Sequence, residues 1–423
     1  MLLKIPRLYD SHTHFLATGE WALGLKLGAL QNAYDVEHLA IKPEHFRGSW
    51  LVGSGWNPQA WPKDLNLKVI LDKAFPHFPV CFIRMDGHSC WVNSQALKAL
   101  GMSSETGVLT ELEHFAAMAK IPSYSKEQEE FQILTACKIF NRAGFTHIRD
   151  LTCSESLWNL LVGMEEKNLL TLAVEENFTA SNANDVERAL KECLYARSHE
   201  TALLRSKGIK IFFDGSLGSE TAFLSKPYGG DPARGCGRPL WDLNDVADVL
   251  RKSWEQKLEV SVHAIGDEAA HQIVKCARDL SAKGFVGRLN MEHIQMARPE
   301  TIQMMKPLHV RCHMQPCHWL SDRVWLKEKL GELYKYVFPW EALRAAQMPL
   351  SFGCDSPIEP PSFFNNEKAL RESAKEKIRK FTGDLSIIHA HPDTEFAPES
   401  YTVIENEQIK EVVFRGKPLL LEA

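Results

Sequence analysis

The chain has 423 residues, of which 44% are hydrophobic and 24% charged, and its formal net charge is −5. This composition is typical of a globular protein and excludes a disordered or fibrous one. Acidic and basic residues are interspersed without a basic stripe, so nucleic acid is not an expected partner. No apolar run reaches the ~18 residues of a membrane helix, and the first residues lack the apolar core of a signal peptide.

The ten cysteines are scattered along the chain, and none forms a Cys-x-x-Cys pair. Several lie in apolar runs, which indicates reduced thiols in a core rather than a disulfide framework or a zinc–sulfur site. We therefore expect a cytoplasmic protein without membrane association.

The first predicted strand, Leu8–His14, ends in two histidines that are two residues apart. Alternate residues of a strand point to the same side, so His12 and His14 can direct both imidazoles at one metal ion. A single His-x-His motif also occurs at strand ends without a metal, so its interpretation depends on the rest of the chain.

A long, aromatic-rich segment of about 130 residues separates this strand from the next, far more than a usual βα connection. It contains two further strand-like runs, Trp50–Ser54 and Val80–Arg84. The insertion leaves from the C-terminal end of the first strand. In a barrel of parallel strands, which the later runs predict, active sites lie at this end, so we expect the insertion to form a folded lid over an active site. The alternative is a structural extension far from the chemistry.

Seven short apolar runs after this insertion complete a set of eight predicted strands. After Leu8–His14 they are Phe145–Asp150, Leu170–Glu175, Gly208–Asp214, Leu258–His263, Arg288–His293, Leu308–His313 and Pro349–Asp355. Helical patterns separate most of them, at Ser125–Arg142, Ser154–Lys167, Asn182–Arg205, Asp242–Gln256, Asp267–Lys283 and Arg298–Met305. This alternation predicts an α/β fold with a parallel sheet closed as a (β/α)8 TIM barrel. An open doubly wound sheet is the alternative, but its Gly-x-Gly-x-x-Gly turn does not occur.

Short β-like segments end the chain, at Leu385–His389, Tyr401–Ile404 and Lys410–Phe414. They could pair with Leu2–Ile5 in a small sheet beside the barrel. We therefore expect a barrel over residues 7–360 with an insertion at about 16–125, and a small, reduced β-sandwich from residues 1–6 and 380–423.

Potential metal ligands recur at the C-terminal ends of the predicted strands, where barrel active sites lie. They are His12, His14, Lys210, His263, His293 and Asp355. Packing explains one strand-end histidine more easily than it explains this set. Imidazoles and a carboxylate suit zinc or a similar divalent ion, which lowers the pKa of a bound water towards ~7. Asp355 could then accept a proton from that water as general base.

Lys210 is unusual in this set because an ammonium group repels a cation. It could bind metal only as a carbamate formed with carbon dioxide, whose two oxygens would bridge two ions. Otherwise it is a substrate-binding or structural lysine. The sequence leaves open whether one or two ions bind, and zinc is the expected metal.

These residues resemble the metal site of the amidohydrolase superfamily. That family carries His-x-His on the first strand, an often carboxylated lysine on the fourth, one histidine each on the fifth and sixth, and an aspartate on the eighth. The chain is similar to the YtcJ-like, amidohydrolase-3 branch, which includes N-substituted formamide deformylase. The resemblance covers roughly residues 7–360, and its motifs are Gly55–Trp61, Arg84–Ser94, Thr106–Glu111, Lys210–Ser219, His263–Asp267, Met314–His318 and Phe352–Pro357.

The resemblance implies hydrolysis of a non-peptide C–N bond. It also implies that His88 projects into the pocket and hydrogen-bonds the substrate carbonyl, unless it stabilises the lid instead. Glu111 is either a metal or substrate contact or a solvated loop acid. Further expected substrate contacts are Trp91, Asp214 and His318. The short N-terminal segment and the short tail depart from the family pattern. A homodimer is therefore one possible oligomeric state.

Four aromatic residues of the insertion bear on the substrate class. They are Trp56, Trp61, Phe82 and Trp91. If the insertion folds over the barrel, they form apolar walls that favour a neutral, partly apolar amide such as an N-acyl or N-formyl amine. The alternative is that they form the core of the insertion.

Two other functions fit part of the pattern. A phosphoesterase of the polymerase-and-histidinol-phosphatase (PHP) type also opens with His-x-His on a barrel, and a catalytically silent metal- or ligand-binding barrel would keep the same fold. Lys210 and the single Asp355 favour the amidohydrolase over the phosphoesterase. The presence of every ligand position argues against a decayed site.

Overall fold

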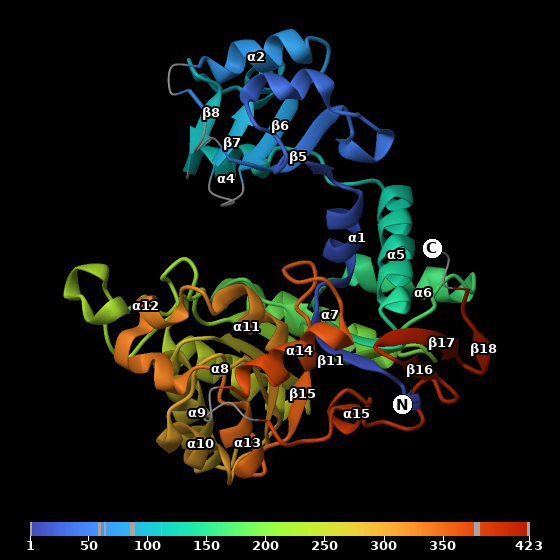
Figure 1. Cartoon of the computed structure of the whole chain (residues 1–423), viewed down its shortest axis with the longest axis vertical. Coiled ribbons are helices and arrows are strands. Elements are labelled where there is room, and N and C mark those ends of the chain that lie inside the picture. The colour runs from blue at the N-terminus through green and yellow to red at the C-terminus, as the bar shows by residue number, and fades with distance from the viewer. Residues whose placement is uncertain are drawn as a thin grey trace. The chain divides into compact units, whose positions relative to one another are not determined.

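The computed structural model describes residues 2–57, 61–62, 65–84, 89–110, 112–375 and 381–420, with Leu112 and Phe115 described by their backbone alone. The chain divides into two compact units. Unit 1 comprises Met1–Phe15 and Cys137–Ala423, and unit 2 comprises Leu16–Ala136. The two unit boundaries fall in α1 (Phe15–Leu23) and α5 (Lys126–Arg142), through which the chain leaves and re-enters unit 1 (Figure 1).

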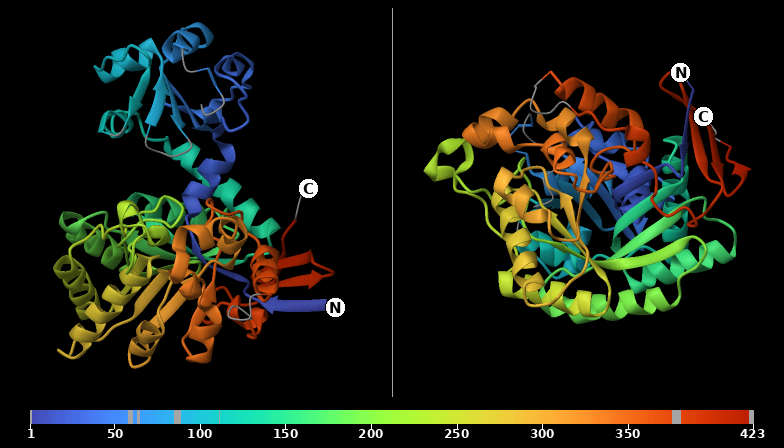
Figure 2. Two further views of the ribbon diagram at one scale, coloured as in Figure 1. Left: turned by 60° about the vertical axis from the view of Figure 1, so that its left-hand side comes forward. Right: turned by 90° about the horizontal axis from the view of Figure 1, so that it is seen from below.

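The described part of unit 1 is built on a sheet of eight parallel strands in the order β15-β14-β13-β12-β11-β10-β9-β2. The strands are β2 (Tyr9–Thr13), β9 (His147–Cys153), β10 (Ala173–Thr179), β11 (Leu204–Phe212), β12 (Glu259–Ala264), β13 (Leu289–His293), β14 (Val310–Met314) and β15 (Leu350–Phe352). Each overlaps one of the eight predicted runs. The strand order follows the chain, and the strands form a ring with helices outside it (Figure 2). The predicted TIM barrel is therefore confirmed.

The ring closes between β15 and β2 through individual hydrogen bonds. The Asp355 N–H donates to the His12 carbonyl (2.8 Å), and the Cys354 N–H donates to the Asp10 carboxylate (3.1 Å). Gly353 permits this approach, because a Cβ at that position would lie 2.6 Å from the backbone nitrogen of His12. The closure therefore fixes the segment that carries Asp355 against the strand that carries His12.

Helices cover the outside of the ring (Figures 1 and 2). They include α6 (Glu155–Glu166), α7 (Val186–Ser198), α8 (Leu243–Glu255), α9 (Asp267–Ser281), α10 (Pro299–Met305), α13 (Trp340–Ala345) and α14 (Phe363–Ser373). Two short helices, α11 (Pro316–Asp322) and α12 (Leu326–Leu330), belong to the segment that follows β14. In α9, Ile273, Ala277 and Leu280 are buried at the spacing of one helix face. The predicted helix Asn182–Arg205 was too long, because α7 ends at Ser198 and β11 begins at Leu204.

A second sheet joins the two ends of the described chain. It is antiparallel, in the order β1-β16-β17-β18, with β1 (Leu2–Pro6), β16 (Tyr401–Glu405), β17 (Gln408–Phe414) and β18 (Lys417–Pro418). This confirms an extra β-sheet formed by the termini, but among the described residues it is one sheet and not the two packed sheets of the predicted β-sandwich. The β prediction for Leu385–His389 was wrong. That segment forms the helical turn α15 (Leu385–Ile388), whose start is capped by the side chain of Asp384.

Unit 2 has a sheet of its own, which among the described residues runs β3-β5-β6-β7-β8 with β4 beside β5. Its elements are β3 (Leu25–Lys26), β4 (Phe46–Arg47), β5 (Trp50–Trp56), β6 (Val80–Arg84), β7 (Ser89–Val92), β8 (Val108–Thr110), α2 (Leu67–Ala74), α3 (Ser94–Leu100) and α4 (Leu112–Met118). Successive residues of β5 enter two different apolar clusters, Leu51 one and Val52 the other. Both faces of the sheet are therefore packed within unit 2.

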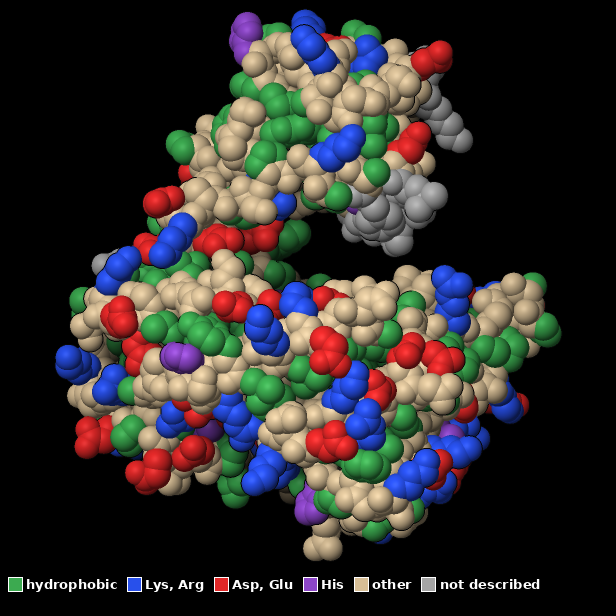
Figure 3. Space-filling view, turned by 180° about the vertical axis from the view of Figure 1, so that it is seen from behind, with side chains coloured by type: hydrophobic (Ala, Val, Ile, Leu, Met, Phe, Trp, Pro, Cys, Tyr) green, Lys and Arg blue, Asp and Glu red, His purple; other side chains and the backbone are tan. Residues whose placement is uncertain are grey.

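The mixed charges of the surface and the free cysteines are those expected from the sequence. Figure 3 shows one face of the molecule, on which Lys and Arg are interspersed with Asp and Glu. All ten cysteines lie among the described residues and none is in a disulfide. In the part of the chain that the structure describes, no helix has both the length and the apolar composition needed to cross a bilayer.

Candidate metal centre

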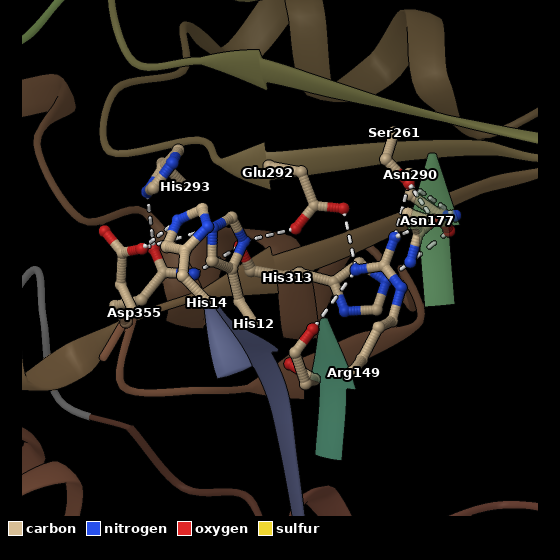
Figure 4. Close-up of polar contacts among 12 residues, drawn as sticks. His12, His14, Arg149, Asn177, Ser261, Asn290, Glu292, His293, His313 and Asp355 are labelled. Carbon is tan, nitrogen blue, oxygen red and sulfur yellow. Dashed lines mark hydrogen bonds and ion pairs between the residues drawn. The ribbon is translucent and has the colours of Figure 1, made fainter. Parts of the chain in front are cut away.

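Three predicted ligands from distant parts of the chain come together at one end of the ring. His12 lies on β2, His293 ends β13, and Asp355 follows β15. Each offers one ligand atom, and these atoms lie within 4.8 Å of one another (Figure 4). All three residues are at most 5% exposed. This is the arrangement in which a divalent ion would be held by two imidazoles and a carboxylate.

The carboxylate of Asp355 faces several imidazoles. Its Oδ1 lies 3.3 Å from Nε2 of His12 and 3.1 Å from Nε2 of His14, and its Oδ2 lies 3.6 Å from Nε2 of His318. Burial alone would raise the pKa of Asp355, but the imidazoles outweigh it and hold that pKa well below its ordinary value. The carboxylate is therefore ionised at neutral pH and able to accept a proton or bind a cation.

Two further predicted ligands have buried nitrogen atoms next to this cluster. Nζ of Lys210 and Nδ1 of His263 have no hydrogen-bond partner among the described residues. The ring of His263 lies with its centroid 4.4 Å from that of His293. Its Nε2 donates to the Gly215 carbonyl (3.1 Å), which leaves Nδ1 as the lone-pair atom. Desolvation lowers the pKa of Lys210 to about 8 and that of His263 to about 3.

Hydrogen bonds set the tautomers of the two imidazoles in this three-residue cluster. Nδ1 of His12 lies 2.6 Å from Oε2 of Glu292, and Nδ1 of His293 lies 3.0 Å from Oε1 of Gln315. Because both oxygens accept a hydrogen bond from Nδ1–H, each ring keeps its lone pair on Nε2. Such outer partners orient metal-binding histidines and raise their basicity.

Glu292 is in turn held by an arginine inside the barrel. Nη1 of Arg149, on β9, lies 2.8 Å from Oε1 of Glu292. Arg149 is 1% exposed and also donates to the carbonyl of Ser11 and to the hydroxyl of Ser261 (Figure 4). Pairing offsets the cost of burying these two charges. The sequence analysis assigned no role to Glu292 or Arg149, and its only signal was the adjacency of Glu292 to His293.

The backbone is in an unusual conformation at two of the candidate ligands. His293 has φ of 66° and Asp355 has φ of 61°, in the left-handed region that residues with a Cβ seldom adopt. Neighbouring residues of a regular strand point to opposite faces. The turn of the backbone at His293 lets both Glu292 and His293 contribute to the same site. Such conformations cost about 1–3 kcal/mol each and cluster at functional sites.

The carboxylate of Asp214, a predicted substrate contact, is engaged by the backbone. It accepts hydrogen bonds from the backbone N–H groups of Phe223, Ile265 and Gly266, at 2.9, 3.0 and 2.9 Å. Burial raises its pKa to about 7, although these donors oppose the shift. Its Oδ1 lies 3.7 Å from Nε2 of His263. Asp214 therefore joins the segments that follow β11 and β12 beside His263.

The aromatic residues of unit 2 form its core. All four are at most 6% exposed and belong to one apolar cluster, and they are Trp56, Trp61, Phe82 and Trp91. The indole N–H of Trp91 donates to the carbonyl of Leu67 (2.7 Å). Packing covers the ring of Trp91, which argues against its predicted contact with substrate. His88 and Glu111 lie outside the described residues, and their roles stay predictions.

The chain is similar in sequence to a known family and to individual proteins. A model of the amidohydrolase family matches residues 3–366. The chain is 28% identical over 401 residues to the putative amidohydrolase YtcJ of Bacillus subtilis (strain 168), covering 89% of this chain and 74% of that protein. It is 28% identical over 392 residues to Protein LONG AFTER FAR-RED 3 of Arabidopsis thaliana, covering 84% of this chain and 66% of that protein.

Two solved structures share the fold. An uncharacterized metal-dependent hydrolase from Pyrococcus horikoshii OT3 superposes with a TM-score of 0.73 at 24% identity, covering 92% of this chain and 78% of that one. Another from Pyrococcus furiosus gives 0.73 at 22% identity, covering 95% and 87%. The likeness extends over nearly the whole chain.

Proposed function

The chain belongs to the amidohydrolase family, and from this premise we propose that it is a metal-dependent hydrolase that cleaves an amide-type C–N bond in a small molecule. Membership of this family supports a hydrolase. It also favours an amide-type substrate over the phosphate ester of a phosphoesterase. The aromatic residues of unit 2 are buried in its core and therefore do not support an apolar substrate. The assays below compare apolar with polar substrates.

The convergence of His12, His293 and Asp355, next to two unpaired buried nitrogens, carries the proposal. A buried polar atom without a partner costs about 1–3 kcal/mol. Two such atoms, Nζ of Lys210 and Nδ1 of His263, beside a cluster of imidazoles fit a site that a cation completes. Nitrogen and carboxylate donors suit zinc or a similar divalent ion.

One or two divalent ions would be held by His12, His14, His263, His293, Asp355 and a carbamate of Lys210. When bound, such an ion lowers the pKa of a water towards ~7 and polarises a carbonyl. Asp355 then accepts the proton of the attacking water and returns it to the departing amine, so that the acyl group gains the hydroxyl and the nitrogen gains the hydrogen. His318, 3.6 Å from the same carboxylate, lies where it can orient the substrate.

Lys210 would become a ligand by adding carbon dioxide. The ammonium first loses one proton. The neutral amine then forms an N–C bond to carbon dioxide and loses a second proton, so that a cation becomes an anion. The low pKa of this lysine leaves part of it neutral and nucleophilic near neutral pH. The resulting carboxylate would lie among histidines and would attract a cation that the ammonium repels.

Metal analysis of the purified chain, together with assays of the zinc- and manganese-loaded forms, tests the function. We expect a bound divalent metal that is lost from His12→Ala and His263→Ala but kept in His199→Ala, whose side chain is exposed at the end of α7. The substrate panel holds N-formyl and N-acyl amines with apolar and polar acyl groups, N-acyl amino acids, cyclic amides and phosphate esters.

The outcomes separate the three functions. Turnover of amides by the metal-loaded chain, lost in the two ligand variants, supports the proposal. Selective turnover of phosphate esters, or full metal occupancy in both ligand variants, contradicts it. Bound metal without turnover of any amide supports the catalytically silent barrel.

A further inference from the structure

A cavity lies at the opposite end of the barrel strands from the candidate metal centre. Its volume is about 460 Å³, and its lining includes Lys207 on β11, Glu259 on β12 and Arg311 on β14. Glu259 and His263 are four residues apart on β12, which at ~3.3 Å per residue separates the two sites by about 13 Å. None of the candidate metal ligands lines this cavity.

The charged residues that line this cavity are predominantly cationic. Its cations are Arg197, Arg205, Lys207, Lys257, Arg288 and Arg311. Its carboxylates are Glu175, Glu200, Glu259 and Asp393. Six cations against four carboxylates leave a formal excess of two positive charges, in a chain whose net charge is −5. The cavity therefore gathers positive charge against the trend of the whole molecule.

Two of the four carboxylates of the cavity have partners other than its arginines. Glu175 accepts a hydrogen bond from Tyr9 (2.7 Å) and pairs with Lys207 (3.2 Å). Glu259 accepts a hydrogen bond from the side-chain amide of Asn290 (2.8 Å). Their capacity to neutralise the arginines is therefore reduced.

The arginines keep unused donors. Within the described part of the chain, the guanidinium of Arg311 forms no hydrogen bond or ion pair. Arg288 approaches Glu259 only to 3.7 Å, and Arg205 approaches Glu200 only to 3.8 Å, both beyond hydrogen-bonding distance. A guanidinium has five donors. Arg288 and Arg311, at the starts of the neighbouring strands β13 and β14, can therefore both receive an anion.

We propose that this cavity binds a small organic phosphate, with the guanidinium groups of Arg288 and Arg311 holding the phosphate. A guanidinium fork matches phosphate oxygens in pairs, and such charged hydrogen bonds are stronger than neutral ones. The excess of two positive charges matches a phosphate dianion. The volume falls in the range of small-molecule pockets, about 300–1,000 Å³, so it holds an organic group as well as the phosphate.

Calorimetric titration of the full chain tests this site. The probes are inorganic phosphate, adenosine monophosphate and a sugar phosphate, each at constant ionic strength. Each titration is made with the metal-loaded chain and with the chain after chelation. The variants are Arg311→Gln, Arg288→Gln and Arg311→Lys, and circular dichroism checks their fold. The matched control is Arg278→Gln, an exposed arginine of α9 that pairs with its neighbour Asp279.

We expect saturable binding of at least one phosphate ester that chelation leaves unchanged. Arg311→Gln and Arg288→Gln should each raise its Kd about tenfold or more, because a charged hydrogen-bond pair is lost. Arg311→Lys should lie between the glutamine variant and the wild type, and Arg278→Gln should match the wild type.

Three outcomes would overturn the site. One is the absence of saturable binding of any probe. Another is binding that disappears on chelation and survives Arg311→Gln, which would place the phosphate at the metal centre. The third is an equal loss in Arg278→Gln, which would reduce the effect to general electrostatic attraction. The proposed hydrolase function is independent of all three results.

Discussion

Oε2 of Glu292 lies 2.6 Å from Nδ1 of His12, although 280 positions separate the two residues in the chain. The carboxylate accepts a hydrogen bond from Nδ1–H, and Nε2 of His12 lies 3.3 Å from Oδ1 of Asp355. Arg149 holds the other carboxylate oxygen of Glu292. The tautomer and orientation of one candidate ligand therefore depend on a buried ion pair inside the barrel.

Replacing Glu292 with glutamine should weaken metal binding by about 10–100-fold, because an amide is a poorer acceptor for the Nδ1 proton. Competition with a chelator of known affinity measures the change. Glu255→Gln is the control, since Glu255 is an exposed residue of α8 that pairs with Arg251. Unchanged metal affinity in Glu292→Gln would mean that Glu292 serves only to balance the charge of Arg149.

Reconstitution of the metal-free chain should depend on pH through Lys210, whose pKa is lowered by burial to about 8. Only the neutral amine adds carbon dioxide, so metal uptake should be faster at about pH 9 than at about pH 7 and should be accelerated by bicarbonate. Metal content followed over time measures the rate.

Lys210→Ala supplies the control for this experiment. It should abolish the bicarbonate effect, and short carboxylic acids should restore activity by replacing the missing carboxylate. A rate that ignores bicarbonate at every pH would indicate a mononuclear site with an unmodified lysine.

Changing Asp355 to asparagine should reduce turnover by about 10²–10⁴-fold, the usual contribution of a general base. The variant should keep most of its metal, because the imidazoles of His12, His263 and His293 remain. Metal content and kcat on a substrate found in the amide panel measure both effects. Near-normal turnover would assign the proton transfer to another group.

Removing the side chain of Trp91 should destabilise the chain by about 3–5 kcal/mol, because the ring is 0% exposed and packs in the core of unit 2. Metal content should not change, since the candidate ligands of the metal centre lie in unit 1; they are His12, His14, Lys210, His263, His293 and Asp355. Urea unfolding gives the free energy, and Trp21→Ala, at a site 49% exposed, is the control. A stable Trp91→Ala variant with only a raised KM would restore this residue to the substrate pocket.

The barrel could be predicted because its signals are local. Each strand is a short apolar run, and the runs alternate with helical periodicity, as in α9. The meeting of His12, His293 and Asp355 then follows from topology, since the C-terminal ends of parallel strands share one edge of the ring. Nothing beyond strand order was needed to bring these residues together.

The remaining features depend on contacts that the sequence does not show. Arg149 and Glu292 are buried charges within strand-like runs, and their partner in each case is far away in the chain. The apolar run Leu385–Ile388 suits a strand or a helical turn, and the cap formed by Asp384 decides for the turn. For Trp91, composition alone did not distinguish a pocket wall from a core.

The position of the insertion has a consequence for how this chain could have evolved. Unit 2 enters after β2 and returns before β9, and these two strands are hydrogen-bonded neighbours. It also carries its own sheet and apolar clusters. The ring therefore keeps its register whatever the length of the inserted module. A single recombination event can therefore exchange that module and leave unchanged the strands that carry the candidate metal ligands.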